Sequence, residues 1–245
     1  MKMKSYRYMN TYLTKAWMPS FLVCSNLWSR LTQHYVMIVN VFFLQDATRN
    51  SVLDWLTRFK VIKGIARGLL YLHQDSRIFE GNEQQANTIR VVGTCGYMSP
   101  EYAMEGSSSV KSDTYSFGVL LLEIVSGSKI SSSHFMTDFT NLIAYAWSLW
   151  KDGNARELVD SSIVENCPLH EVLRCIHIGL LCVQDNPSAR PLMSSTVFML
   201  ENETAPLPTP KEPLYFRQRY DEVEDQRDTM GITLNKMTIT VQEGR

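Results

Sequence analysis

Apolar residues between positions 53 and 201 recur mostly at steps of three and four, which is the spacing of one face of an α-helix. From Leu53 onward, basic side chains occupy positions opposite to the apolar ones, and Asp54 stands where an N-cap is expected. This pattern predicts an amphipathic helix that begins near Asp54. Its apolar positions are Val61, Ile62, Ile65, Ala66, Leu69, Leu70 and Leu72.

A second helix is predicted from Tyr115 to Val125, where the sequence is apolar nearly all round. Such a helix is buried on every side, so we expect it at the centre of a helical bundle, with Gly127 as its C-terminal stop. Three more helical patterns follow, at Asn141–Lys151, Pro168–Gln184 and, over a shorter range, Met193–Glu201. The expected fold class is therefore mainly α.

Three parts of the chain lack a sustained helical pattern. Residues 1–52 mix aromatic and basic side chains without a period and form an unassigned N-terminal segment. Residues 80–109 are polar and contain several glycines, which predicts a long loop with short turns. After Glu201, four prolines fall within residues 206–213, which predicts an extended, mobile tail over 202–245 rather than a packed one.

Composition narrows the class of protein. The 24 Lys and Arg residues nearly balance the 25 Asp and Glu residues, which argues against a polybasic nucleic-acid binder. The five cysteines are dispersed, with no pair at the two-residue spacing of a zinc or redox site, so a reduced intracellular setting is expected. The longest apolar run, Tyr35–Leu44, is too short for a membrane-spanning helix of about 20 residues. We therefore expect a cytoplasmic protein.

Several motifs in fixed order resemble plant receptor-like serine/threonine protein kinases of the S-domain (G-type lectin) and cysteine-rich classes. The resemblance covers residues 53–201, as an incomplete large lobe with no recognisable small lobe, and continues into the tail at Pro210–Tyr215. It is carried by the helix Gly64–His73, by Gly93–Tyr102 at the end of the activation segment, by Ser112–Gly118 in the central helix and by Cys182–Pro191.

The resemblance implies roles for individual residues. Glu101 is expected to form a structural ion pair with Arg190, and Asp113 would accept hydrogen bonds from the backbone of the catalytic loop. Because that loop is missing, the Asp113 carboxylate must be hydrated or find a new donor. Thr88 and Thr94 occupy positions of activation-segment hydroxyls, and we interpret them as inert loop residues rather than phosphorylation sites.

The residues that perform phosphoryl transfer in this family are absent. Transfer needs backbone donors and a lysine at the phosphates, a catalytic aspartate, and an Asp/Asn pair for magnesium. None of the 12 glycines forms a Gly-x-Gly-x-x-Gly loop, and neither His-Arg-Asp nor Asp-Phe-Gly occurs. Asp138-Phe139 is followed by Thr140 and lies after the central helix, so it is not the metal-binding motif. The break falls between Arg77 and Ile78.

Two hypotheses explain the missing motifs. In the first, the chain is a degenerate receptor-like kinase, a pseudokinase that needs no cofactor and serves as an interaction module for other kinases or receptor complexes, but not for nucleic acid. In the second, it is a truncated or mispredicted version of an active kinase that uses ATP and magnesium, and residues 1–52 are translated non-coding sequence. A helical scaffold unrelated to kinases is a weaker third reading. Full-length members of the family sit at the plasma membrane.

Histidines and tryptophans offer further candidates. His170-Glu171 begins like a zinc-protease helix, but position 174 is Arg instead of His. We therefore interpret the histidines as helix-surface residues rather than metal ligands; they are His73, His134, His170 and His177. Trp147 and Trp150 are expected to be core or groove-lining aromatics.

Overall fold

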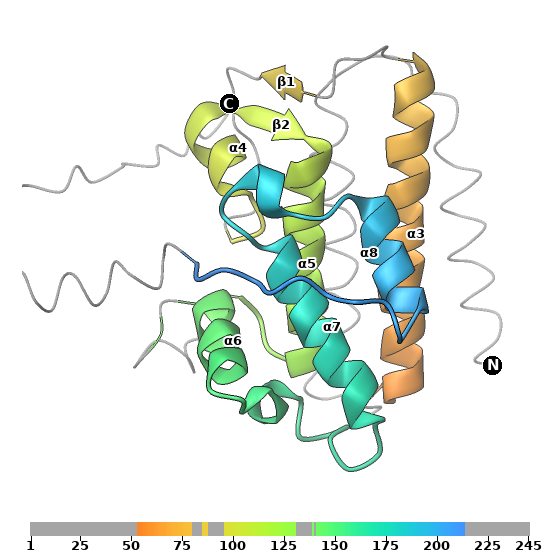
Figure 1. The fold of residues 1–245 in the computed structure, drawn as a ribbon, viewed down its shortest axis with the longest axis vertical. Coiled ribbons are helices and arrows are strands. Elements are labelled where there is room, and N and C mark those ends of the chain that lie inside the picture. Colours follow the sequence, from red (N-terminus) through yellow and green to blue (C-terminus); the bar gives the residue numbers. More distant parts are fainter. Residues whose placement is uncertain (1–52, 80–84, 88–95, 131–138, 140, 214–245) are drawn as a thin grey trace, which may run out of the picture.

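The computed structural model describes residues 53–79, 85–87, 96–130, 139 and 141–213. These residues form a mainly helical structure, as the sequence predicts (Figure 1). Its elements are the helices α3 (Trp55–Phe79), α4 (Pro100–Glu105), α5 (Val110–Ser126), α6 (Leu142–Lys151), α7 (Leu169–Cys182) and α8 (Met193–Glu201), the short 3-10 helices η4 (Ala155–Leu158) and η5 (Pro187–Ala189), and the strands β1 (Gln85–Asn87) and β2 (Ser107–Ser109).

Helix α3 begins where the sequence predicts it, because the Asp54 carboxylate accepts a hydrogen bond from the Thr57 backbone N–H at 3.0 Å. It continues past His73 to Phe79 and runs without interruption through Arg77 and Ile78. The helix therefore spans the point at which the sequence lacks a catalytic loop.

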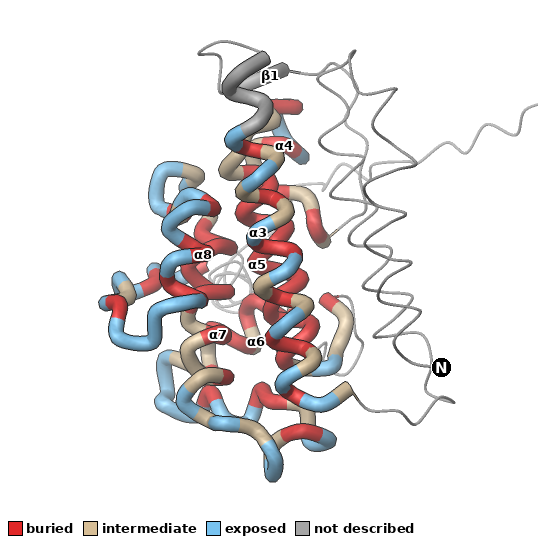
Figure 2. Tube along the Cα trace, turned by 90° about the vertical axis from the view of Figure 1, so that its right-hand side faces the viewer, coloured by how far each residue is buried: buried red, intermediate tan, exposed pale blue. Residues whose placement is uncertain are grey.

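Helix α5 lies at the centre of the bundle, as expected, and every residue from Ser112 to Val125 is buried. A capping box of Ser109 and Ser112 begins the helix at Val110, five residues earlier than the apolar pattern indicates. Gly127 ends it in the left-handed conformation with φ 66°. The buried interior formed around α5 is visible in Figure 2.

Helix α7 packs directly against α5 through two glycines. A Cβ atom on Gly118 of α5 would lie 2.6 Å from the Cys182 Cβ, and one on Gly179 of α7 would lie 2.9 Å from the Leu122 Cδ2. The two backbones are therefore too close for any larger residue at either position. Helix α8 packs on α3, where Arg67 and Glu201 form an ion pair at 2.7 Å.

The prediction of a long loop over residues 80–109 is wrong for its second half. Pro100 stands in the first turn of α4, where a missing N–H costs nothing, and Gly106 ends the helix with φ 69°. Strand β2 follows at once and pairs antiparallel with β1, with Ala86 opposite Ser108. The start signal, Pro100, and the stop signal, Gly106, are present in the sequence, but the helix between them has only six residues.

The prediction that the chain after Glu201 is unpacked is also wrong for residues 202–213. Residues 206–213 form no helix or strand, in agreement with their prolines, yet Ala205, Pro210 and Pro213 are buried. This segment lies across α7 (Figure 1). None of the described helices is both long and apolar enough to cross a membrane.

Candidate functional site

Arg190 connects α4 with the segment that follows α7. Its side chain is completely buried, and its two Nη atoms donate to the two Glu101 carboxylate oxygens at 2.7 and 2.8 Å. The guanidinium also donates to three backbone carbonyls, those of Gln184, Lys111 and Asp185. The structure thus brings together the Glu101 and Arg190 side chains that the sequence pairs. A planar fork with five donors suits this arrangement, and lysine could not reproduce it.

The Glu101 carboxylate is held in its charged form. Burial raises its pKa, but the hydrogen bonds and positive charge of Arg190 outweigh burial, so the pKa lies below its ordinary value. Ser112 on α5 adds a third donor to the same carboxylate at 3.1 Å. The α4 end of the activation segment is therefore fixed to the helical bundle by a paired, hydrogen-bonded charge.

Asp113 is buried on α5 and lies against His73 of α3. The His73 Nε2 atom is 3.0 Å from an Asp113 carboxylate oxygen, and both side chains are more than nine-tenths buried. The prediction that the carboxylate finds a new donor is consistent with this contact. The prediction that His73 is a helix-surface residue is wrong, because position 73 continues the buried face of Ile62, Ala66 and Leu69 toward α5.

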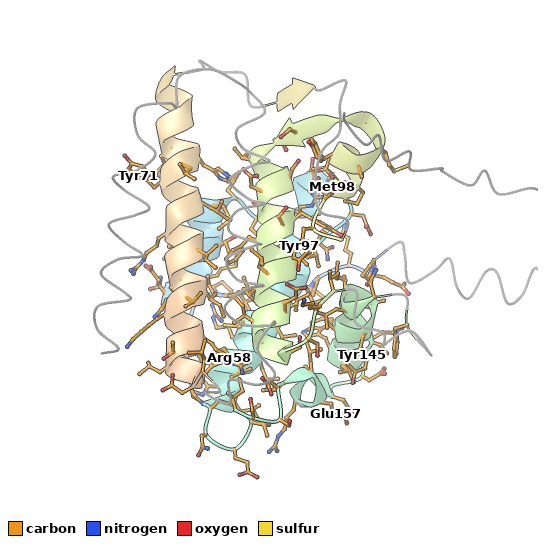
Figure 3. All side chains as sticks on the ribbon, turned by 180° about the vertical axis from the view of Figure 1, so that it is seen from behind. Arg58, Tyr71, Tyr97, Met98, Tyr145 and Glu157 are labelled. Atoms are coloured by element: carbon orange, nitrogen blue, oxygen red, sulfur yellow. The ribbon has the colours of Figure 1, made fainter. Side chains whose placement is uncertain are left out.

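Glu123 is a second buried carboxyl group, which sequence reasoning missed. The Tyr97 hydroxyl lies 2.8 Å from both carboxyl oxygens, and the Ile130 backbone N–H donates to one of them at 2.6 Å. Burial is the main reason why the pKa of Glu123 rises to about 7. Tyr97, labelled in Figure 3, lies three residues before α4, so this contact holds the backbone just before α4 on α5. In the sequence, the sign of this buried group was a single glutamate within the otherwise apolar stretch Tyr115–Val125.

Arg58 is a further buried group that the sequence did not reveal. It lies near the start of α3 (Figure 3), donates to the Ile124 carbonyl at the end of α5 at 2.8 Å, and pairs with Asp160 at 2.5 Å. Burial acts against the charged form of Asp160, yet hydrogen bonds from Ser162 and Arg58 hold its pKa below the ordinary value. In the sequence, Arg58 is one of several basic residues on the helix, and nothing separates it from the exposed ones.

Several predicted residues remain outside this site. Thr88, Thr94 and His134 lie outside the described residues. His170 is exposed, and His177 on α7 contacts Trp150, which stacks on buried Trp147.

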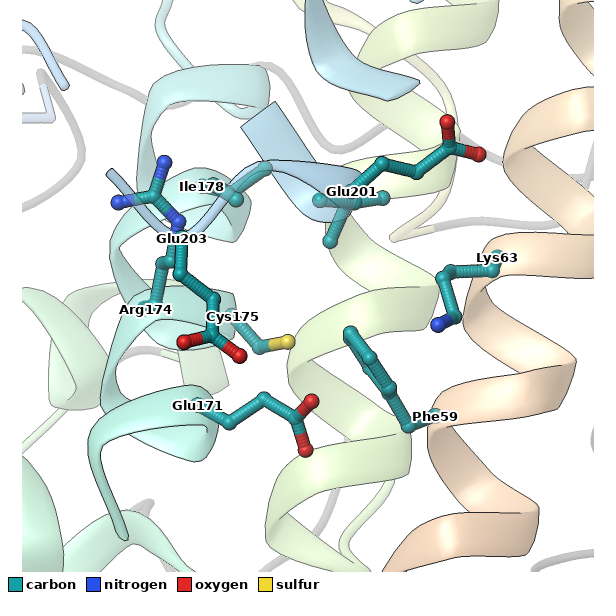
Figure 4. Close-up of a pocket in the computed structure, with 9 residues that line it drawn as sticks. Phe59, Lys63, Glu171, Arg174, Cys175, Ile178, Glu201 and Glu203 are labelled. Carbon is teal, nitrogen blue, oxygen red and sulfur yellow. The ribbon is translucent and has the colours of Figure 1, made fainter. Parts of the chain in front are cut away.

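The described residues include no set of side chains that fits a magnesium–ATP site. Within the described ranges, no group of three or more His, Cys, Asp or Glu side chains is placed to hold a metal ion, and the sequence has no Asp-Phe-Gly. A cavity of about 100 Å³ lies between α3, α7 and α8 (Figure 4), and neither Glu101 nor Asp113 lines it. Burial raises the pKa of the Cys175 thiol that lines it, so the thiol is un-ionised and a poor nucleophile.

Comparison with known proteins identifies the fold. The family of protein tyrosine and serine/threonine kinases matches residues 77–200, which is just over half of the chain. This chain belongs to that family. The match begins at Arg77, the residue at which the sequence analysis places the break, and it covers Glu101, Asp113 and Arg190.

The relatives of this kinase-family chain are plant receptor-like kinases. It is 46% identical to the G-type lectin S-receptor-like serine/threonine-protein kinase B120 of Arabidopsis thaliana over 83% of its own length and 28% of that protein's length. It is 47% identical to cysteine-rich receptor-like protein kinase 10 of the same plant, over 79% of its own length and 34% of that protein's length. The chain thus spans about a third or less of these relatives, and its recognition as a receptor-like serine/threonine kinase domain is confirmed.

The alignments also contain positions that have no counterpart in this kinase-family chain. The alignment with B120 extends over 239 positions, but 83% of 245 residues is only about 203. About 36 aligned positions of B120 therefore have no counterpart in this chain. The same comparison with cysteine-rich receptor-like protein kinase 10, over 225 positions and 79% of the chain, gives about 31 such positions.

A solved structure has the same fold. The chain resembles the pseudokinase domain of BIR2, an immune regulator of the RLK/Pelle family, with a TM-score of 0.53 and 27% sequence identity. The similarity covers 64% of this chain and 54% of the BIR2 domain. The mainly helical, kinase-like architecture predicted from the sequence is confirmed.

Proposed function

We propose that this chain is a receptor-like kinase domain that transfers no phosphate and acts by binding other proteins of a receptor complex, including kinases. One observation carries the proposal: α3 continues as an unbroken helix through Arg77 and Ile78, where relatives of the family have their catalytic loop. The His-Arg-Asp and Asp-Phe-Gly motifs are missing from the sequence at the same time. Without them no aspartate can take the proton of a substrate hydroxyl, and none can hold magnesium.

The contacts that hold the helical part of the domain together are present although the catalytic motifs are missing. Arg190 donates hydrogen bonds to both carboxylate oxygens of Glu101, and the Glu123 carboxyl group is hydrogen-bonded to the Tyr97 hydroxyl and the Ile130 backbone N–H. These contacts hold the end of the activation segment on α5, and in a protein kinase that segment forms part of the surface on which other proteins bind. A domain that keeps such contacts and loses the catalytic motifs is suited to binding.

A phosphate-transfer assay tests this proposal. The purified chain is incubated with labelled ATP, magnesium and a generic protein substrate, beside the kinase domain of an active relative and a denatured sample of the same chain. We expect label incorporation equal to that of the denatured sample. Incorporation above it would overturn the proposal. A thermal-shift titration with magnesium–ATP is a second test, because a ligand at 100 times its Kd stabilises a protein by about 2.7 kcal/mol.

A second candidate is that the chain derives from an active serine/threonine kinase whose catalytic segment is missing from this version of the sequence. The aligned positions without a counterpart in this chain, about 36 in B120 and about 31 in cysteine-rich receptor-like protein kinase 10, favour it, since one continuous missing segment of that size is the simplest cause. Sequencing the transcript across the codons for Arg77 and Ile78 separates the two candidates. An uninterrupted message supports the first, and an inserted exon encoding His-Arg-Asp and Asp-Phe-Gly supports the second.

A further inference from the structure

Residues 202–213, here called the strap, are held on α7 by side chains that bind main-chain atoms. Arg174 donates to the carbonyls of Asn202 and Ala205 at 2.8 and 2.7 Å. Further along, the His177 Nε2 atom lies 2.7 Å from the Pro208 carbonyl oxygen. Because a carbonyl only accepts, that ring nitrogen carries the proton.

Gln184, two residues after α7, completes this row of contacts. Its amide nitrogen donates to the Lys211 carbonyl at 3.1 Å, and its amide oxygen accepts from the Lys211 backbone N–H at 2.9 Å. The Gln184 side chain is buried and is held by a further bond to the Leu180 carbonyl at 2.9 Å. The two bonds to Lys211 fix both the position and the direction of the strap.

The spacing of the contacts fits an extended, proline-containing chain. His177 lies five residues before the end of α7, which corresponds to about 7.5 Å along the helix, and Gln184 follows two residues after that end. Their partners Pro208 and Lys211 are three residues apart, which corresponds to about 9.3 Å in a polyproline conformation. Proline lacks a backbone N–H, so its carbonyl is the polar group available for recognition.

Aromatic and apolar surfaces support the same contacts. Trp150 of α6 meets the His177 ring edge-on at a centroid distance of 5.2 Å and is itself stacked on Trp147 at 5.4 Å. These contacts orient the His177 ring toward the strap. Pro210 and Pro213, on either side of Lys211 in the strap, are buried as well. Aromatic side chains next to hydrogen-bond donors are the usual means of binding proline-rich segments.

We propose that this face of α7 is a binding site for an extended, proline-containing peptide, which the strap occupies in cis. The hydrogen bonds from Arg174, His177 and Gln184 to the strap all end on its main-chain atoms, so a proline-containing segment of another protein with the same spacing competes for the site. The surface is thus a protein-interaction site that opens when the strap is displaced. This inference does not depend on whether the chain transfers phosphate.

Hydrogen exchange of the full chain tests the contacts. In the wild-type protein we expect the Lys211 amide to be protected, and Gln184→Ala to increase its exchange rate about 2- to 13-fold, the range for one net hydrogen bond. Gln74→Ala is the matched control, because it removes the same amide group from an exposed position on α3. Equal Lys211 exchange rates in the wild type and Gln184→Ala would overturn the assignment.

Competition tests the site itself. A synthetic peptide with the sequence of residues 204–213 is titrated into the full-length double variant Pro210→Asp/Pro213→Asp, in which two buried charges detach the strap. We expect saturable shifts of the Trp150 indole resonance, and a loss of affinity of about 10-fold or more when Gln184→Ala is added. In the wild-type chain, millimolar peptide is expected to accelerate Lys211 exchange, because a tethered segment has an effective concentration in that range. If millimolar peptide changes neither chain, no such site exists.

Discussion

Glu123→Gln isolates the effect of the buried carboxyl group that holds the activation segment. The pKa of Glu123 is raised from 4.5 to about 7 in the folded protein, with burial as the main cause. The folded protein therefore favours the protonated, neutral form of Glu123. The contribution of this form to the free energy of unfolding is complete below pH 4.5 and is lost as the pH rises through about 7. At about 1.4 kcal/mol per pKa unit, the loss amounts to about 3 kcal/mol.

Glutamine reproduces the neutral acid in this site. Its amide oxygen can accept from the Ile130 N–H, and its amide nitrogen can donate to the Tyr97 hydroxyl oxygen, in place of the protonated carboxyl. The free energy of unfolding is measured by urea denaturation of both proteins between pH 4.5 and 8. We expect the variant to match the wild type at pH 4.5 and to exceed its stability by about 3 kcal/mol at pH 8.

The difference between the two proteins removes the contribution of every other titrating group. Carboxyl groups with lowered pKa values, such as Glu101 and Asp160, contribute equally to both curves. A constant difference over the whole pH range, or a wild type that gains stability relative to the variant as the pH rises, would refute the reasoning.

Two further predictions concern stability measured by the same denaturation method. Glu101→Gln leaves the Arg190 guanidinium buried without its counter-charge and should destabilise the protein by about 3–5 kcal/mol. Glu105→Gln, on the exposed side of α4, is the control and should change the stability little. Equal effects of the two substitutions would show that the ion pair is unimportant for stability. Gly118→Ala should destabilise the protein by about 1–3 kcal/mol, because the added methyl group overpacks against α7. Gly64→Ala should instead stabilise α3 by about 0.5–1 kcal/mol, because a Cβ atom at this position meets nothing within 4 Å. Two changes of the same sign would contradict the packing described.

The sequence predicts the helices well because their burial is periodic. Met193–Glu201 is helical with the bounds expected, and Asn141 caps the helix that begins at Leu142 because its side chain accepts from the Ala144 N–H. The short α4 was missed because its proline and glycine signals are also typical of turns. Over only six residues, local propensity alone does not distinguish a short helix from a turn.

The polar contacts of the site are harder to predict, since each joins distant parts of the chain. Arg58 bonds to a carbonyl 66 residues away, and Arg190 pairs with a carboxylate 89 residues away. Nothing in the local pattern at Arg58 marks it as buried. The pair of Glu101 and Arg190 was accessible only through resemblance to known kinases, and the strap contacts of Gln184 were not accessible at all.

The packing of α3 on α8 has a consequence for synthesis of the protein. Arg67 and Glu201 lie 134 residues apart, so a ribosome working at about 5–20 residues per second needs roughly 7–27 s to make the second after the first. During that time α5 can already pack on α3, but the surface of α3 that α8 covers in the folded protein stays exposed. The nascent chain therefore presents this part of an amphipathic helix for many seconds, and this interval is when a chaperone has most opportunity to bind it.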